Sequence, residues 1–167
     1  NDAALRQLAS VYAHAGNEEG LERLIELVQQ STVDRSVLLY CQMRLMYLRG
    51  EFERAVQLGE EHAALEPSNV NVYNLLGSSY AALARYDRAR SALEASLRLA
   101  PTDPGVLVNV GTVALRSGNP AAAAERFSEA LFLSPTLPAA LNGLADALEQ
   151  QGDTARAAGI RRRVPSP

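Results

Sequence analysis

An arginine flanked by two tyrosines at helical spacing, Tyr40, Arg44 and Tyr47, has the clearest capacity for chemistry in this chain. Side chains three or four positions apart share one face of a helix. A guanidinium fork grips carboxylates, and tyrosine rings give rigid contact area. This combination favours a surface that contacts a partner, and the alternative is a solvated polar face without a specific partner.

Catalytic residues do not form a recognisable constellation in this sequence. His14 and His62 are not at helical spacing from each other, and metal-ligand, phosphate-binding and nucleophile motifs are missing. The adjacent pairs Glu18–Glu19 and Glu60–Glu61 would point in different directions on a helix. Cys41, the only cysteine, has no neighbour that would depress its pKa, so we expect it to fill space. We therefore expect no enzyme activity, no cofactor and no metal site.

Composition and charge narrow the classes of partner. The net charge is only −3, so the overall charge gives no reason to expect nucleic-acid binding. Every basic residue is an arginine. No stretch reaches the ~18 apolar residues of a membrane span, so no direct membrane insertion is expected. Arg161, Arg162 and Arg163 lack interleaved aromatics, and we interpret them as the solvated end of a helix. The compartment stays open between cytoplasm and periplasm, and the start at Asn1 favours a soluble fragment of a longer chain.

The elements that must position these side chains repeat with a period of 34 residues. Segments that begin at Val70 and at Pro104 carry small or apolar residues at the same positions of the period. They are Tyr73, Leu76, Gly77, Tyr80, Ala89, Leu93 and Pro101 in the first segment, and Leu107, Val110, Gly111, Ala114, Ala123, Phe127 and Pro135 in the second. The spacing predicts two helices of about 12–14 residues in each segment.

The joints between the predicted helices carry turn and capping residues. Gly118 precedes Asn119, and Asn119 and Asp153 are predicted N-caps. Asp103 is predicted to cap the helix that begins at Pro104, whereas Leu137 occupies the equivalent cap position one period later. We therefore interpret the recurring proline loops as connections that end one unit and begin the next, and not as binding loops.

This pattern resembles the tetratricopeptide repeat, W-x₂-L-G-x₂-Y…A-x₃-F…P with a period of 34 residues. The frame predicts a single domain over residues 1–167, with repeats at 2–35, 36–69, 70–103, 104–137 and a truncated 138–167. The resemblance implies an all-α fold, a right-handed α-solenoid of helix–turn–helix hairpins. It also implies a scaffold that binds a peptide segment or partner protein in a concave groove.

The predicted groove face lies on the first helix of each repeat, opposite the stripe that enters the core. It consists of Arg6, Ser10, His14, Tyr40, Arg44, Tyr47, Asn71, Asn74, Ser78, Asn109, Thr112, Arg116, Asn142 and Asp146. Arginines and tyrosines in the first half favour an acidic peptide. Asn74, Asn109 and Asn142 could hydrogen-bond a peptide backbone, and this partial ladder is similar to that of the repeat domain of O-GlcNAc transferases.

The second repeat departs from the family pattern at three positions. Met43 stands where a small residue is usual, Gly59 where a large one is usual, and His62 where alanine is usual. We favour compensation, in which Met43 fills the space left by Gly59, over a local opening that shapes a pocket. Only Arg6 resembles the carboxylate clamp that grips chaperone tails, so that mode is not expected.

Three functions remain open from the sequence. The first is an interaction scaffold without catalysis of its own. The second is a recruiting or regulatory arm of a larger enzyme such as a glycosyltransferase. The third is a structural module that self-associates, because open-ended helical arrays can stack.

Overall fold

The computed structural model describes residues 1–165, and its regular elements in that range are ten α-helices. The chain divides into two compact units, Asn1–Arg85 (unit 1) and Tyr86–Pro167 (unit 2). This division falls inside the predicted third repeat, residues 70–103. The predicted single domain and the repeat boundaries therefore stay predictions, and each unit is described by itself.

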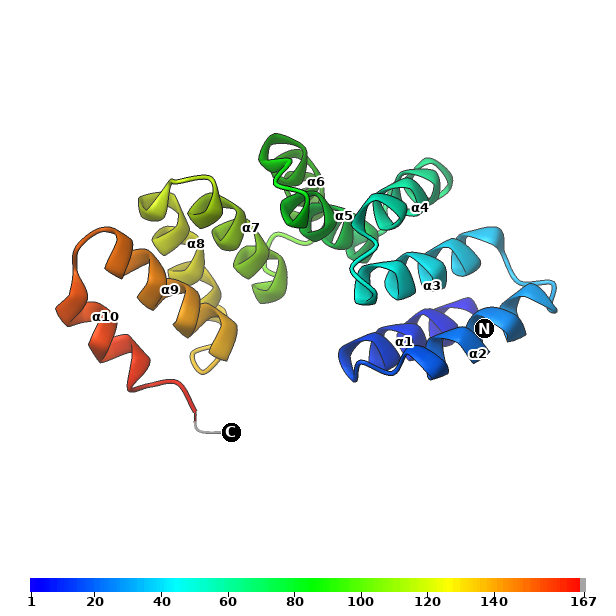
Figure 1. Cartoon of the computed structure of the whole chain (residues 1–167), viewed down its shortest axis with the longest axis horizontal. Coiled ribbons are helices and arrows are strands. Elements are labelled where there is room, and N and C mark those ends of the chain that lie inside the picture. The colour runs from blue at the N-terminus through cyan, green and yellow to red at the C-terminus, as the bar shows by residue number, and fades with distance from the viewer. Residues whose placement is uncertain (166–167) are drawn as a thin grey trace. The chain divides into compact units, whose positions relative to one another are not determined.

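Unit 1 consists of five helices that form consecutive hairpins (Figure 1). They are α1 (Asp2–His14), α2 (Glu18–Gln29), α3 (Arg35–Leu48), α4 (Phe52–Leu65) and α5 (Val70–Ala82). Helix α1 packs against α2 and α3, and α3 packs against α4 and α5. Alternate helices therefore stack on one another, which aligns residues that are one period apart in the sequence.

Unit 2 contains the other five helices. They are α6 (Tyr86–Leu99), α7 (Pro104–Arg116), α8 (Pro120–Leu133), α9 (Pro138–Gln150) and α10 (Thr154–Arg161). Helix α7 packs against α6, α8 and α9, and α9 also packs against α8 and α10. None of the helices within residues 1–165 has both the length and the apolar character needed to cross a membrane.

The capping residues predicted from the sequence begin three helices of unit 2, α7, α8 and α10. The Asp103 carboxylate accepts hydrogen bonds from two backbone amides of α7, and the side chains of Asn119 and Asp153 each accept one from α8 and α10. These bonds satisfy amides that have no partner inside the helix. Helix α9 starts at Pro138 after Leu137, which provides no side-chain cap.

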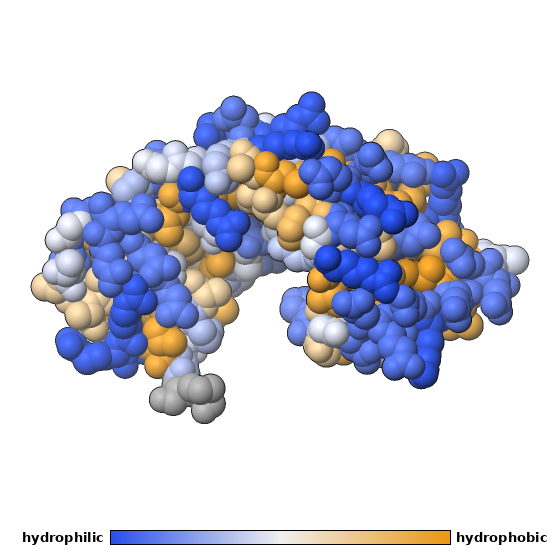
Figure 2. Space-filling view, viewed as in Figure 1, coloured by the Kyte–Doolittle hydropathy of each residue, from blue (hydrophilic) through white to orange (hydrophobic). Residues whose placement is uncertain are grey.

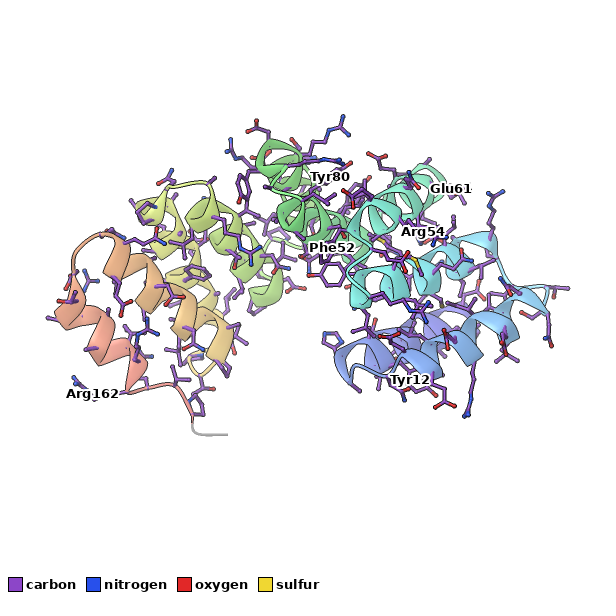
Figure 3. All side chains as sticks on the ribbon, in the orientation of Figure 1. Tyr12, Phe52, Arg54, Glu61, Tyr80 and Arg162 are labelled. Carbon is purple, nitrogen blue, oxygen red and sulfur yellow. The ribbon has the colours of Figure 1, made fainter. Side chains whose placement is uncertain are left out.

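Close helix crossings depend on glycines that face large side chains. A Cβ added to Gly59 on α4 would lie 2.6 Å from Cε of Met43 on α3, so Met43 occupies that space as predicted. In α2, Gly20 gives room to the ring of Tyr12 from α1, which is labelled in Figure 3. Phe127, at 1% exposure, fills the centre of the unit 2 core.

Candidate functional site

Three residues of the predicted groove face meet between α1 and α3, and we call Ser10, Tyr40 and Arg44 the Arg44 cluster. Arg44 donates through Nη2 to the Tyr40 hydroxyl at 2.7 Å and to Ser10 Oγ at 2.9 Å, and through Nε to the same tyrosine hydroxyl at 3.1 Å. Because Ser10 donates to the Arg6 carbonyl, the Tyr40 hydroxyl donates to Ser10 Oγ, at 2.9 Å. The guanidinium is thus held by a connected set of hydroxyls.

Stacking of α1 on α3 explains this meeting, since Ser10 and Arg44 are 34 residues apart. The same stacking corrects the expectation for Tyr40, whose ring was predicted to contact a partner but is only 1% exposed. Its position on α3 faces α1, so the ring belongs to the packing between the helices. The Arg44 guanidinium lies over this ring, 5.2 Å from its centroid, in a cation–π contact.

The charge of Arg44 is not neutralised by a carboxylate within residues 1–165. Its hydrogen-bond acceptors are neutral hydroxyls, and its side chain is partly accessible to solvent. A positioned, partly dehydrated guanidinium without an anionic neighbour favours an external anion. The geometry therefore leaves Arg44 available to a carboxylate of another molecule.

Arg6, the other arginine predicted in the first half of the face, is neutralised within unit 1. It donates to Ser36 Oγ at 2.7 Å and forms an ion pair with Glu66, which also accepts from Ser36 at 2.6 Å. Burial would raise the pKa of Glu66, but the hydrogen bonds from Arg6 and Ser36 outweigh it and hold that pKa below its ordinary value. Arg6 is therefore a weaker candidate for a peptide contact than the sequence predicted.

Two further predicted residues lie at the ends of α1 and α3. His14 is exposed, and its Nδ1 lies 2.7 Å from the Ser10 carbonyl oxygen. Tyr47 is half-buried and meets Phe52 edge to face, with ring centroids 5.4 Å apart. Its ring is consequently more accessible than that of Tyr40.

Helix α5 carries the remaining predicted residues of unit 1. Asn71 is exposed, whereas Asn74 and Ser78 are half-buried. The Ser78 hydroxyl donates to the Asn74 carbonyl at 3.1 Å. This bond satisfies the hydroxyl within the helix, so Ser78 offers a partner chiefly its acceptor capacity.

In unit 2, α7 carries Asn109, Thr112 and Arg116. The Thr112 hydroxyl donates to the Val108 carbonyl at 2.9 Å. Arg116 is exposed in the last turn of α7, where a cation is favoured by the helix dipole. Asn109 is half-buried. Arg116 is therefore the accessible cation of this predicted set in unit 2.

Helix α9 carries Asn142, which is exposed, and Asp146, whose charge is already paired. Arg161 of α10 donates to Asp146 at 2.8 Å and to Glu149 at 3.0–3.1 Å. Hydrogen bonds from Arg161 lower the pKa of Glu149. Asp146, predicted for the groove face, and its neighbour Glu149 are therefore engaged by α10, while Arg162, labelled in Figure 3, is exposed at the end of α10.

Sequence reasoning missed the internal partners of these charged residues. Ser36 and Glu66 lie 30 and 60 residues from Arg6, and Arg161 lies 15 residues from Asp146. The helical period predicts which face a side chain occupies, but it does not predict which distant side chain reaches it. Glu66 stands where the next two periods have Ala100 and Ser134, and this departure was the one available signal.

The adjacent glutamates Glu18 and Glu19 point in different directions, as predicted for neighbours on a helix, and they form ion pairs with different arginines. Glu18 pairs with Arg49, whereas Glu19 pairs with Arg23. Cys41 is buried, and burial raises its pKa to about 11, so the thiol stays protonated near neutral pH. The prediction that Cys41 fills space is consistent with this burial.

Hydrophilic residues cover much of the face shown in Figure 2, with apolar patches between them. The largest exposed apolar side chains include Val11 on α1, at 56%, and Phe132 on α8, at 86%. Single exposed apolar residues are ordinary at protein surfaces. They do not by themselves mark a second site.

Comparison with known sequences gives matches to one family. Two sequence models described as tetratricopeptide repeat match, one over residues 70–103 and the other over residues 110–164. The search of curated proteins gave no match.

Solved structures of similar fold cover nearly the whole chain. A tetratricopeptide repeat protein of Thermus thermophilus, TTC0263, is 21% identical with a TM-score of 0.80, over 98% of this chain and 89% of that one. MamA residues 41 to the end from Desulfovibrio magneticus RS-1 is 20% identical with a TM-score of 0.75, over 97% and 92% of the two chains. A further MamA structure is 17% identical with a TM-score of 0.74, over 93% and 91%. Together with the ten helices within residues 1–165, these likenesses show the fold as an α-solenoid of helical hairpins.

Proposed function

The chain belongs to the tetratricopeptide repeat family, and on that premise we propose that unit 1 binds an acidic segment of a partner protein through the Arg44 cluster. A general role as a protein-interaction scaffold is what this family and fold support. The finer proposal concerns the chemistry of the contact. In this proposal, a carboxylate of the partner binds the guanidinium of Arg44.

The observation that carries the proposal is the contrast between two arginines of the same face. Arg6 has its carboxylate in Glu66, while Arg44 is oriented by the neutral hydroxyls of Ser10 and Tyr40. Fixing the side chain in advance reduces the conformational entropy lost on binding. A carboxylate that approaches Arg44 therefore meets a cation that is already oriented and incompletely compensated.

Other residues of the predicted face extend this proposal. The half-buried ring of Tyr47 gives contact area beside Arg44, on the same helix. Asn71 on α5 exposes a side-chain amide that can hydrogen-bond a peptide backbone. We assign a general backbone contact to Asn71 and charge recognition to Arg44.

The test uses an array of extended peptides in which each acidic peptide has a partner with Gln and Asn in place of Glu and Asp. We expect the wild-type chain to prefer the acidic member of some pairs. Arg44→Gln should weaken binding to those peptides about tenfold to hundredfold, because a charge-assisted hydrogen bond is lost. Arg44→Glu should weaken it further through repulsion. Fluorescence anisotropy with the peptides selected from the array gives the dissociation constants.

Arg23→Glu is the matched control, since it makes the same change of charge on α2, where the Arg23 side chain is 75% exposed and pairs with Glu19. We expect this variant to bind within a factor of about two of the wild type, because exposed surface pairs contribute little. Equal losses of peptide affinity in Arg23→Glu and Arg44→Glu would show that the net charge of the protein, and not a contact with Arg44, causes the loss. Unchanged affinity in Arg44→Gln would remove the Arg44 cluster as the site.

A further inference from the structure

His62 on α4 is fully buried, at 0% exposure, and neither of its ring nitrogens has a hydrogen-bond partner within residues 1–165. Its ring meets the edge of Tyr40, with centroids 6.2 Å apart. A buried polar atom without a partner costs free energy and is uncommon in folded proteins. The imidazole is therefore held in place by the packing around it.

The charged groups that act on His62 come from three helices. Arg6 belongs to α1, Asp34 caps α3, and Glu66 follows the last turn of α4. Helix α5 also packs on α4, and its titratable side chains are Tyr73 and Tyr80. Of the two carboxylates, Glu66 already accepts from Arg6 and Ser36.

This environment suits only the neutral imidazole. A protonated ring has two N–H donors, and neither nitrogen has an acceptor within the described residues where it lies. Burial lowers the pKa of His62, and nearby Arg6 adds to this effect, although Glu66 and Asp34 act in the opposite direction. Protonation therefore requires the ring to reach water or a free acceptor.

Helix α1 buries less apolar surface against the rest of unit 1 than the other helices of this unit do. Ala9 is the one fully buried residue of α1, while Leu8 and Val11 are 38% and 56% exposed. Polar contacts from Arg6 and Ser10 make much of the remaining attachment to α3 and α4. Elements with little buried apolar surface open at low free energy.

We propose that uptake of a proton by His62 releases α1 from its polar contacts with α3 and Glu66, so that unit 1 opens in mildly acidic solution. The open form exposes the imidazole and lets it keep its proton. Glu66 and Ser36 then lose Arg6, and Arg44 loses Ser10 as an acceptor. Opening is therefore coupled to loss of the polar junction between α1, α3 and α4.

The direction of the pH dependence follows from the lowered pKa. Above the ordinary value of 6.5, His62 is neutral in both forms and the closed form keeps its full stability. Below it, the open form binds the proton more tightly than the closed form, so the open population rises as the pH falls. Between pH 7.5 and pH 5.5 this linkage raises the open population by up to about tenfold, the value reached when the closed form binds no proton. Glu66 contributes only below its ordinary value of 4.5, outside this interval.

Hydrogen exchange of the full chain, read by mass spectrometry, tests the proposal. Protection factors, corrected for the intrinsic pH dependence of exchange, are compared between amides of α1 and amides of α8 in unit 2. In the wild type we expect α1 protection to fall by up to about tenfold from pH 7.5 to pH 5.5, while α8 protection stays constant. His62→Leu, which has similar volume and no titration, should remove the fall.

His14→Gln serves as the control, because His14 is the only other histidine and is exposed on α1. We expect it to keep the wild-type response. Constant α1 protection in the wild type would overturn the proposal, and so would a fall of the same size in His62→Leu. Should His62→Leu fail to fold, an NMR titration of the wild-type His62 ring decides: a pKa at or above 6.5 in the closed form overturns the proposal.

Discussion

Ala84 adopts a positive φ of 55° at a joint where the other repeats place glycine. Gly50 precedes it by 34 residues and Gly118 follows it by 34, with φ values of 75° and 82°. At this joint the Ala84 amide donates to Ala81 O and the Arg85 amide donates to Tyr80 O, which is the pattern of a Schellman helix end. The joint requires the left-handed conformation, and alanine adopts it at a cost.

We therefore predict that Ala84→Gly stabilises the protein by about 0.5–1 kcal/mol, which is the strain relieved less the added freedom of the unfolded chain. Urea unfolding followed by circular dichroism measures the change. Gly118→Ala makes the reverse change at the equivalent joint and should cost about 1 kcal/mol. A destabilised Ala84→Gly would show that Ala84 is not strained.

Single residues were predictable where the chemistry is local. Asp103 caps α7 through amides two and three residues away, and such a bond depends only on neighbouring sequence. Tyr40 and His62 depend on helices that are distant in sequence. The burial of Tyr40 against α1 and the lack of partners for His62 among the described residues follow from packing that a helical period does not specify.

At the scale of whole helices, α7, α8 and α9 approach one another because glycines face the Phe127 ring. A Cβ added to Gly143 on α9 would lie 2.4 Å from this ring, and one added to Gly111 on α7 would lie 2.9 Å from it. Distances this short require a shift of the ring or of the helix. Phe127 is 1% exposed in the core of unit 2, so neither can move freely.

We predict that Gly143→Ala destabilises unit 2 by about 1–3 kcal/mol, because overpacking outweighs the gain in helix propensity. Gly159→Ala is the matched control on α10, where the nearest atom to the new Cβ is 3.9 Å away. That variant should be neutral or stabilising by up to about 1 kcal/mol. Thermal unfolding of both variants measures the difference, and equal midpoints would refute tight packing at Gly143.

Helices were the part of the fold that the sequence predicted well. Their apolar spacing and the 34-residue period set their number and placement, and Pro104, Pro120 and Pro138 begin α7, α8 and α9. The face of each helix was predicted less well, because packing against a neighbour decides what remains exposed. Arg161 of α10, for example, pairs with Asp146 of α9, which the period placed on an open face.

Over the whole molecule, the two units differ in the groups that respond to mild acid. Both histidines, His14 and His62, belong to unit 1. In unit 2 the carboxylate with a lowered pKa is Glu149, and its effect begins below its ordinary value of 4.5. Five of the six tyrosines also lie in unit 1, and Tyr86 is the exception. Near-ultraviolet circular dichroism therefore reports chiefly on unit 1, while the far-ultraviolet signal reports on the helices of both units.

We predict that lowering the pH from 7.5 to 5.5 lowers the melting temperature seen by the tyrosine signal by up to about 6–11 °C, since a tenfold linkage is about 1.4 kcal/mol. The far-ultraviolet melt should become broader or biphasic, because unit 2 loses no stability in this interval. His62→Leu should remove the shift of the tyrosine signal and leave the far-ultraviolet component of unit 2 unchanged. A parallel shift of both signals in the wild type would contradict the assignment of the acid response to unit 1. It would place the response instead in a single cooperative transition of the whole chain.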